Sequence, residues 1–270
     1  MKFSLLFVLM GLMVFLRSQT VSVDFNNTQD LSSKFSIYSG NGVYDFTNTS
    51  NGGLSGSSGS LLSSNSYNTN NIFIYNSTSF SILTPVSLSL YFKHSLNGSF
   101  GFPISLGIYS SSTSSPQWSA LLQLNEVSRG TYSLTEKTTV NGSLLVSTGT
   151  AISNISLTDS TWYKMSASFG FESPSGLSIN SFLEQSDNNG NITSLLGSSE
   201  TLYLLSGFSR STLVFAGFQT DGAPLASGVL ALDNFYATSQ AIPEASTVQF
   251  LFLLLVGVLF RKRSFFHFIK

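Results

Sequence analysis

The stretch VSLSLYFK at residues 86–93 decides the fold class. In this stretch apolar residues alternate with mostly polar ones: Val86, Leu88, Leu90 and Phe92 with Ser87, Ser89, Tyr91 and Lys93. Successive side chains of a β-strand point to opposite faces, so a period of two is typical of a strand with one buried face. We therefore expect a strand here that packs one side against a core.

Runs of the same character recur through the middle of the chain, separated by clusters of Ser, Thr, Asn and Gly. We expect strands at residues 86–92, 104–108, 118–124, 131–136, 162–171, 177–183, 201–205, 213–218 and 229–237. Turns are expected at Asn97-Gly98, Asn141-Gly142, Ser175-Gly176, Asn189-Gly190 and Asp221-Gly222. This density of short strands predicts an all-β fold, a two-sheet jelly-roll sandwich over residues 23–241.

The composition narrows the classes of function. Charged residues make up 9% of the chain and the formal net charge is −1, so we expect no nucleic-acid partner. The chain has no cysteine and only two histidines, which excludes disulfides and thiolate metal sites and leaves few candidates for a general base. The stability of the sandwich must therefore come from its core.

Three stretches of the middle region resemble concanavalin-A-like, or laminin-G-like, jelly rolls. Trp118–Leu122 is similar to a core strand of that superfamily, Leu157–Lys164 to its loop and strand with a Trp-Tyr pair, and Leu230–Phe235 to its closing strand. The resemblance implies the fold. It does not select a function, because jelly rolls serve as lectins, hydrolases and adhesion modules.

The N-terminal segment has the pattern of an export signal. Lys2 supplies a positive start, and residues 3–16 form an apolar run that is too short to span a bilayer comfortably. Small residues follow at 18–22 and are typical of a cleavage region. We expect residues 1–22 to be a signal peptide, with an uncleaved anchor as the alternative.

The C-terminal segment has the pattern of a short membrane anchor with a positive stop. Residues 248–260 are apolar except for Gln249, and we expect a single transmembrane helix there. The basic residues that follow, Arg261, Lys262 and Arg263, should stay cytoplasmic together with a tail at 264–270.

Residues 242–263 resemble the PEP-CTERM sorting signal of Gram-negative bacteria. That signal joins a Pro-Glu-Pro motif to a short apolar helix and a basic cluster. The motif residues here are Pro243, Glu244, Ala245, Ser246 and Thr247, with Ala245 in place of the second proline. The resemblance implies an exosortase-type membrane peptidase as partner and a final location at the cell surface or in the extracellular matrix, in association with exopolysaccharide. The alternative is a stable tail anchor.

Catalytic residues are sparse. Glycoside hydrolysis needs two close carboxylates, and the nearest approach is Glu184 with Asp187, which has no third acid in step. His94 is the only histidine of the middle region, and we expect it to be an ordinary surface residue at a strand end. The sequence therefore predicts that the protein is not an enzyme.

Two stretches are candidates for structural calcium. In its strand, Asp233 is expected to share a face with Val229, Ala231 and Phe235. An acid on an apolar face needs a partner, and Asp24 would lie beside it if the first and last strands are neighbours. The alternative is that Asp233 accepts hydrogen bonds from backbone amides. The stretch 187–191 also offers oxygen ligands, but an Asn-Gly turn explains it better.

Three functions remain open after these considerations. The first is a non-enzymatic exported surface or matrix protein, the second is an anchored carbohydrate-binding, lectin-like module, and the third is a divergent glycoside hydrolase. A carbohydrate-binding site would use exposed aromatic side chains as stacking platforms. The candidates are Trp118, Trp162, Tyr109 and Tyr132, although both tryptophans fit a core position better.

Overall fold

The structure is a computed structural model of the 270-residue chain. It describes residues 19–26, 30–39, 46–49, 52–54, 60–63, 70–82, 84–95, 104–128, 130–141, 143–145, 152–173, 176–204, 213–221 and 229–239. All of these belong to one compact unit, Gln19–Ser239. The predicted transmembrane helix, sorting motif and basic stop lie outside the described residues, as does most of the predicted signal peptide.

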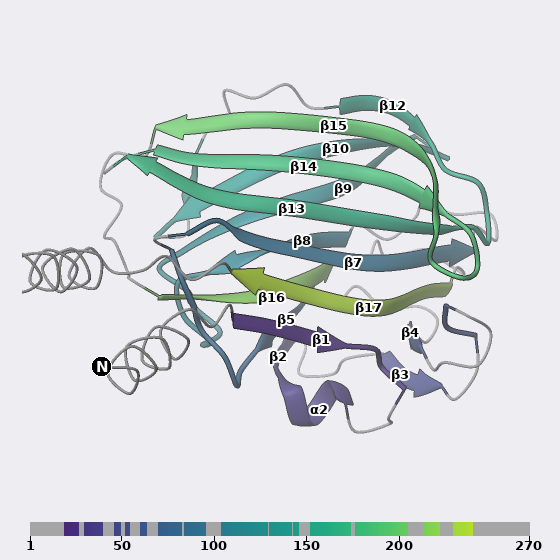
Figure 1. The fold of residues 1–270 in the computed structure, drawn as a ribbon, viewed down its shortest axis with the longest axis horizontal. Helices are drawn as coiled ribbons and strands as arrows, with labels where there is room; N and C mark the ends of the chain where they lie inside the picture. Colours follow the sequence, from purple (N-terminus) through teal and green to yellow (C-terminus); the bar gives the residue numbers. More distant parts are fainter. Residues whose placement is uncertain are drawn as a thin grey trace, which may run out of the picture. The chain divides into compact units, whose positions relative to one another are not determined.

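Sheet A has eight strands among the described residues and lies toward the viewer in Figure 1. Its main path runs in the order β15, β14, β13, β7, β17, β4, β3, and β1 also pairs with β17. Their bounds are β1 Gln19–Val23, β3 Phe46–Thr49, β4 Ser60–Ser63, β7 Val86–Ser95, β13 Trp162–Ser173, β14 Gly176–Ser186, β15 Ile192–Leu204 and β17 Val229–Ser239.

Sheet B packs behind sheet A and has nine strands among the described residues. Its main path is β11, β10, β9, β8, β16, β5, β2, with β12 beside β10 and β6 beside β16. Their bounds are β2 Phe35–Ser39, β5 Asn70–Tyr75, β6 Phe80–Ser81, β8 Ile104–Tyr109, β9 Trp118–Ser128, β10 Thr131–Val140, β11 Ser143–Leu145, β12 Ile152–Ser156 and β16 Leu213–Asp221. One short helix, α2 (Asp30–Lys34), is present in the described part of the chain.

Alternation along the strands builds the core between the two sheets. Leu90 and Phe92 of β7 are buried in it, as the opening stretch predicts. Aromatic rings fill one end, where Phe35 and Phe218 lie 5.4 Å apart between ring centroids in an edge-on arrangement. The all-β, two-sheet sandwich is therefore confirmed, in a form consistent with a jelly roll.

Nine strands lie where the sequence predicts them, and two of the predicted turns are observed. Asn141 and Gly190 both have positive φ angles, of 49° and 82°, which Asn and Gly tolerate best. The strand predicted at 201–205 is much longer than expected, because β15 begins at Ile192. Its residues alternate poorly, since many of them are exposed at the edge of sheet A.

The first strand begins at Gln19, inside the segment predicted as signal peptide. Five residues of β1 pair antiparallel with β17, from Gln19 with Ser239 to Val23 with Phe235. The first and last strands are thus neighbours, as the calcium hypothesis assumed. A signal peptide that ended at Ser22 would include four of these five paired residues.

Strand β17 contains a bulge in its middle. Asp233 pairs with Tyr91 and Tyr236 pairs with Ser89, so the segment of β17 holds one residue more than that of β7. Asn234 takes a φ of 48° at this point. On the other edge, β17 pairs with β4 at Ala231–Leu232 and with β1 at Phe235–Ser239, so the bulge lies where the partner changes.

No helix within the described ranges has both the length and the apolar character that a membrane crossing requires.

Candidate functional site

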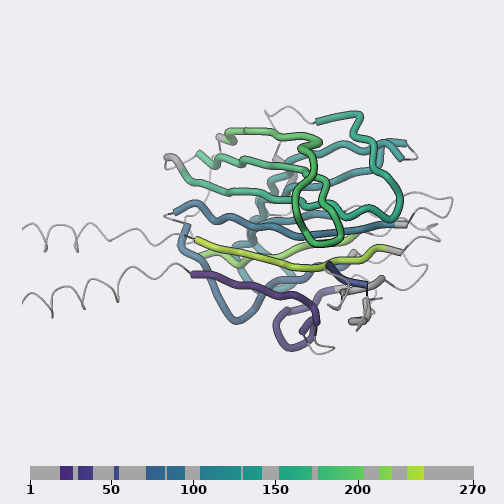
Figure 2. Tube along the Cα trace, turned by 45° about the vertical axis from the view of Figure 1, so that its right-hand side comes forward, coloured from purple at the N-terminus to yellow at the C-terminus, as the bar shows by residue number. Residues whose placement is uncertain are grey.

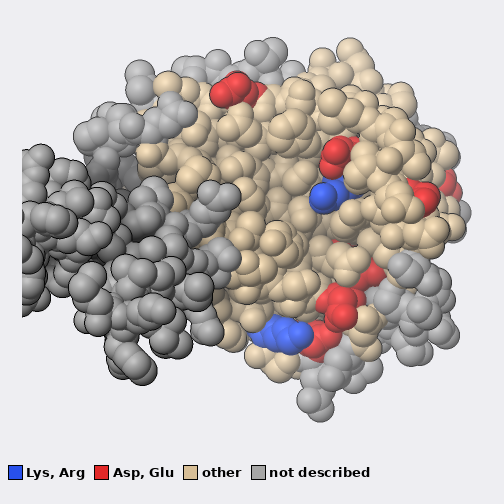
Figure 3. Space-filling view, viewed as in Figure 1, with Lys and Arg blue, Asp and Glu red and all other residues tan. Residues whose placement is uncertain are grey.

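The surface of sheet A that points away from the core carries two transverse rows of side chains, which we call the A face. The strand registers place Tyr236, Ser89, Ser166 and Phe182 in one row, across β17, β7, β13 and β14. The next row holds Asp233, Tyr91, Lys164 and Glu184 on the same four strands. Figure 3 shows that charged side chains are few on this side of the molecule and that several of them gather at its lower right.

Two aromatic side chains at the ends of the first row are exposed to solvent. Phe182 is 43% exposed and Tyr236 is 39% exposed. Three strand spacings separate them, which corresponds to about 14 Å. Large aromatic side chains are usually buried, so two exposed ones in one row are the informative feature of this surface.

Small hydroxyl side chains fill the space between and beside the two aromatic residues. Ser89 and Ser166 stand opposite each other between them. One step along the strands, Ser87 Oγ donates to Ser168 Oγ at 3.2 Å. Short side chains leave the sheet surface low between the aromatic rings while keeping donors and acceptors available.

The tip of the β14–β15 hairpin folds over the second row. Tyr91 Oη donates to the main-chain oxygen of Gly190 at 3.0 Å, although Gly190 lies in the turn between β14 and β15, and neither strand is a neighbour of β7. Figures 1 and 2 both show this hairpin bending in front of the sheet. Burial, with the nearby charges of Glu184 and then Asp187, raises the pKa of Tyr91, so its hydroxyl stays protonated as a donor.

A small apolar cluster covers the end of the A face nearest β4. Trp162, Ala231 and Leu54 are buried together, with Tyr91 packed against them. Lys93 Nζ lies 4.7 Å from the centre of the Trp162 ring and 3.5 Å from the oxygen of Gly52. Trp162 is therefore closed to a ligand by its own neighbours.

Asp233 lies beneath the same cover. Its Oδ2 accepts from the Leu54 amide at 2.8 Å and its Oδ1 from the Asn234 amide at 2.7 Å. The pKa of Asp233 is raised to about 6: burial is the largest cause, the two hydrogen bonds oppose it in part, and the charge of Asp24 adds a smaller increase. We expected Asp233 to share a face with Phe235, but that prediction is wrong: the bulge turns Phe235 toward the core and leaves Asp233 on the A face beside Ala231.

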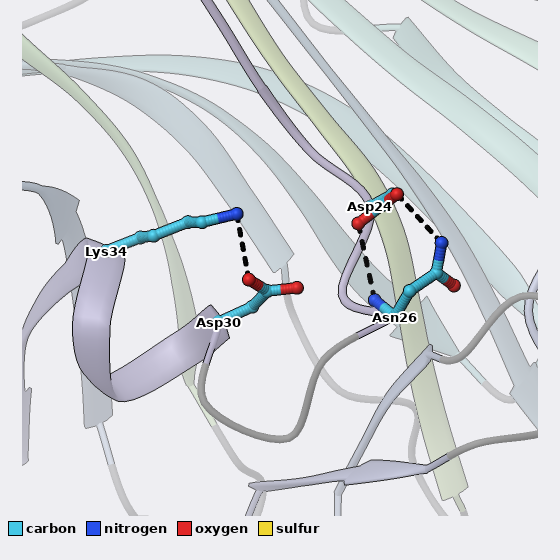
Figure 4. Close-up of polar contacts among 4 residues, drawn as sticks. All are labelled: Asp24, Asn26, Asp30 and Lys34. Atoms are coloured by element: carbon cyan, nitrogen blue, oxygen red, sulfur yellow. Dashed lines mark hydrogen bonds and ion pairs between the residues drawn. The ribbon is translucent and has the colours of Figure 1, made fainter.

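Asp24 follows β1, and its carboxylate accepts hydrogen bonds from the nearby Asn26. Its Oδ2 accepts from Asn26 Nδ2 at 2.8 Å and its Oδ1 from the Asn26 amide at 3.4 Å (Figure 4). Nearby, Asp30 and Lys34 of α2 form an ion pair of 2.8 Å. Within the described ranges, no three His, Asp or Glu side chains converge on one point. Calcium at Asp24 and Asp233 stays a prediction, and both carboxylates already have amide donors.

The stretch 187–191 forms the turn that its sequence favours. Asp187 Oδ1 accepts from the amides of Asn189 and Asn191 at 2.8 and 2.9 Å, and Asn191 Nδ2 donates to Oδ2 at 2.9 Å. The bond from the Asn191 side chain is the main reason why the pKa of Asp187 lies below its ordinary value. The carboxylate therefore stabilises the hairpin tip.

Three of the sequence-based assignments need correction. His94 is buried, not on the surface, and its ring lies 5.6 Å from that of Tyr132 and 6.4 Å from that of Tyr163. Burial lowers its pKa. Tyr109 and Tyr132 are also buried, so they cannot serve as stacking platforms. Trp118 and Trp162 are buried as well, which confirms the preferred core position for both, although Trp162 belongs to the small outer cluster.

The sequence analysis missed the two exposed aromatic residues. The alternation of Leu177, Ile179 and Leu183 already implies that Phe182 points outward. No such signal exists for Tyr236, because its outward direction depends on the bulge in β17.

Comparisons with known proteins support the fold and go no further. No protein-family model and no curated protein matches the chain. A solved structure of a protein of unknown function from Shewanella oneidensis MR-1 is 14% identical, with a TM-score of 0.56, over 86% of this chain and 92% of its own.

Other solved structures that match include lectins and alginate lyases. The seed lectin of Lotus tetragonolobus is 14% identical, with a TM-score of 0.47, over 83% of this chain and all of its own. The PL-14 alginate lyase of Aplysia kurodai is 12% identical, with a TM-score of 0.48, over 83% of this chain and 98% of its own.

Proposed function

We propose that this chain is an exported, non-enzymatic protein of the bacterial surface or matrix, and that its A face binds extracellular polysaccharide. The observation that carries the proposal is the row in which exposed Tyr236 and Phe182 flank Ser89 and Ser166. Aromatic faces stack on the apolar faces of sugar rings, and hydroxyl groups between them exchange hydrogen bonds with sugar hydroxyls. Each of these groups suits an uncharged chain of sugars better than a charged ligand.

The spacing of the two aromatic side chains supports a polymer as the ligand. About 14 Å across three strand spacings exceeds the width of one sugar ring, so one monosaccharide would contact only one ring at a time. A chain that crosses the strands would reach both. We therefore expect binding to strengthen with oligosaccharide length.

The non-enzymatic part of the proposal rests on the state of the two nearest acids. Glu184 belongs to the second row of the A face, whereas Asp187 accepts hydrogen bonds within its own turn at both oxygens. A catalytic carboxylate must instead reach the scissile bond or a water beside it. We infer binding without turnover.

Binding and turnover can be tested on the full chain in mild detergent. We expect affinity electrophoresis against neutral and acidic polysaccharides to show binding that weakens about tenfold with either Phe182→Ala or Tyr236→Ala, since each loses a stacking platform. Leu213→Ala is the matched control, because Leu213 is 47% exposed on sheet B. Absence of binding to any polysaccharide would contradict the proposal. Release of new reducing ends that Glu184→Gln abolishes would replace it with the hydrolase alternative.

Export and sorting form the second part of the proposal and rest on the two ends of the sequence. We expect an exosortase-type peptidase of the native host to read Pro243 and Glu244 and to remove the tail that contains Arg261–Lys270. Changing Pro243 and Glu244 together to Ala should leave unprocessed protein in the membrane fraction. A C-terminal tag that stays intact in the membrane with the wild-type chain would instead indicate a stable anchor.

A further inference from the structure

A carboxyl side chain lies between the two sheets, on the inner side of β10. The inward positions of β10 are Tyr132, Leu134, Glu136, Thr138 and Val140, and Glu136 is only 8% exposed. A buried carboxylate is costly unless a positive charge or several donors compensate it. Within the described residues, no Lys, Arg or His forms an ion pair with it.

The neighbours of Glu136 are oxygen atoms. Ser181 Oγ on β14 donates to Glu136 Oε1 at 2.9 Å and also lies 3.4 Å from the main-chain oxygen of Ser199 on β15. Tyr203 Oη donates to the main-chain oxygen of Glu136 at 2.9 Å. These bonds bring the inner faces of β14 and β15 directly against β10.

Three oxygen atoms in this region find no hydrogen-bond partner among the described residues. They are Glu136 Oε2, Thr138 Oγ1 and Thr201 Oγ1, and Thr138 and Thr201 are 0% and 3% exposed. Thr138 is the next inward residue after Glu136 on β10. Thr201 lies on the inner face of β15 between Ser199 and Tyr203, the two residues whose bonds join that strand to Glu136.

We propose that these side chains form a binding site for a small monovalent cation, with Na⁺ as the best match. All the atoms that would coordinate the ion are hard oxygen atoms, which bind alkali and alkaline-earth cations and not the softer transition metals. The site holds a single carboxylate among neutral hydroxyls, so one positive charge balances it. The cation joins the two sheets at this end of the sandwich and contributes to stability by binding only the folded chain.

The test is the melting temperature of the full chain in NaCl and in choline chloride at equal ionic strength. We expect the wild-type protein to melt about 2–4 °C higher in NaCl. Glu136→Gln should lose this difference, because the amide carries no charge. Glu200→Gln on the exposed side of β15 is the matched control and should keep it. Thr201→Val, which preserves the volume of the side chain, should reduce the difference even if Glu136→Gln fails to fold.

Sodium NMR gives a second, direct measurement. We expect the wild-type chain to broaden the sodium resonance and Glu136→Gln to broaden it less. Equal melting temperatures of the wild type in Na⁺, Li⁺, K⁺ and choline would overturn the proposal. So would an Na⁺ effect of the same size in Glu136→Gln. Loss of polysaccharide binding has no bearing on this site, because none of its residues belongs to the A face.

Discussion

The outer faces of the two sheets differ in what happens to their aromatic side chains. On sheet B, Tyr109, Ile74 and Leu121 form a buried cluster, with Tyr38 packed against it and its hydroxyl bonded to the oxygen of Ser112. On sheet A, Phe182 and Tyr236 stay exposed above a row of serines. Tyr109 of sheet B is thus covered by its neighbours while Phe182 and Tyr236 of sheet A are not, and the proposed polysaccharide site rests on this difference.

Two glycines explain how sheet B closes its outer face. Gly107 pairs with Leu121 and with Gly217 on the neighbouring strands. A Cβ at Gly107 would collide with the main-chain oxygen of Ala120 and would lie 2.6 Å from Leu121 Cδ2. The absence of side chains therefore lets Leu121 and Tyr109 lie flat on the sheet.

The largest effect should come from filling this space. We expect Gly107→Ala to lower the free energy of unfolding by about 2–4 kcal/mol, because neither the main chain of Ala120 nor the buried Leu121 can move freely. Chemical denaturation measures this. Ser89→Ala on the A face should change it by less than about 0.5 kcal/mol. If the two substitutions lowered the free energy of unfolding equally, the outer face of sheet B would not be more tightly packed than the A face.

The covered end of the A face should give a pH-dependent effect. The pKa of Asp233 is about 6 in the folded chain, whereas an aspartate in an unfolded chain has its ordinary pKa of 3.8. Folding therefore favours the protonated form. The stabilisation is complete below the unfolded value and is lost as the pH rises through about 6. We expect the free energy of unfolding to fall by about 2–3 kcal/mol from this group between pH 4 and pH 7.

Asp233→Asn should remove that part of the pH dependence, since the amide does not titrate. Denaturation curves of both proteins across this pH range measure the difference. Glu200→Gln, at an exposed position, should retain the wild-type profile. A variant at Asp233 with an unchanged profile would show that this carboxyl does not cause the effect.

Substitutions of the two exposed aromatic side chains of the A face should weaken binding and leave the stability of the fold nearly unchanged. We expect the double substitution of Phe182 and Tyr236 by Ala to weaken polysaccharide binding by about 100-fold, or ~2.8 kcal/mol if the two contributions add. The melting temperature should stay within about 2 °C, because both side chains are already exposed. A large drop in stability would mean that the pair belongs to the packing of the sheet.

The smallest effect concerns the hairpin tip. Tyr91→Phe removes the hydrogen bond to Gly190 and should cost about 1 kcal/mol of stability. Faster amide exchange confined to residues 187–191 would locate the loss at the tip. Unchanged exchange there would indicate that the turn built by Asp187 holds the tip without help from Tyr91.

Local patterns in the sequence were sufficient to predict the positions of many strands of the sandwich. Alternation placed β7, β8, β9 and β14, since each packs one face against the core, and Asn-Gly pairs located two of the turns. The start of β15 was missed because an edge strand exposes side chains on both faces and loses the alternation. The burial of His94 was missed because its neighbours Tyr132 and Tyr163 come from strands distant in sequence.

Strand β17 separates what the sequence determines alone from what the tertiary structure decides. Its β-branched and aromatic residues specify a strand, and Asn234 is a residue that accepts a positive φ. Whether the chain uses that property depends on pairing with β4 before the bulge and with β1 after it. Counting from Leu230 and Leu232, an unbroken strand would bury Tyr236 and expose Phe235. One extra residue reverses this order, because side-chain direction has a period of two, and it thereby places Tyr236 on the A face.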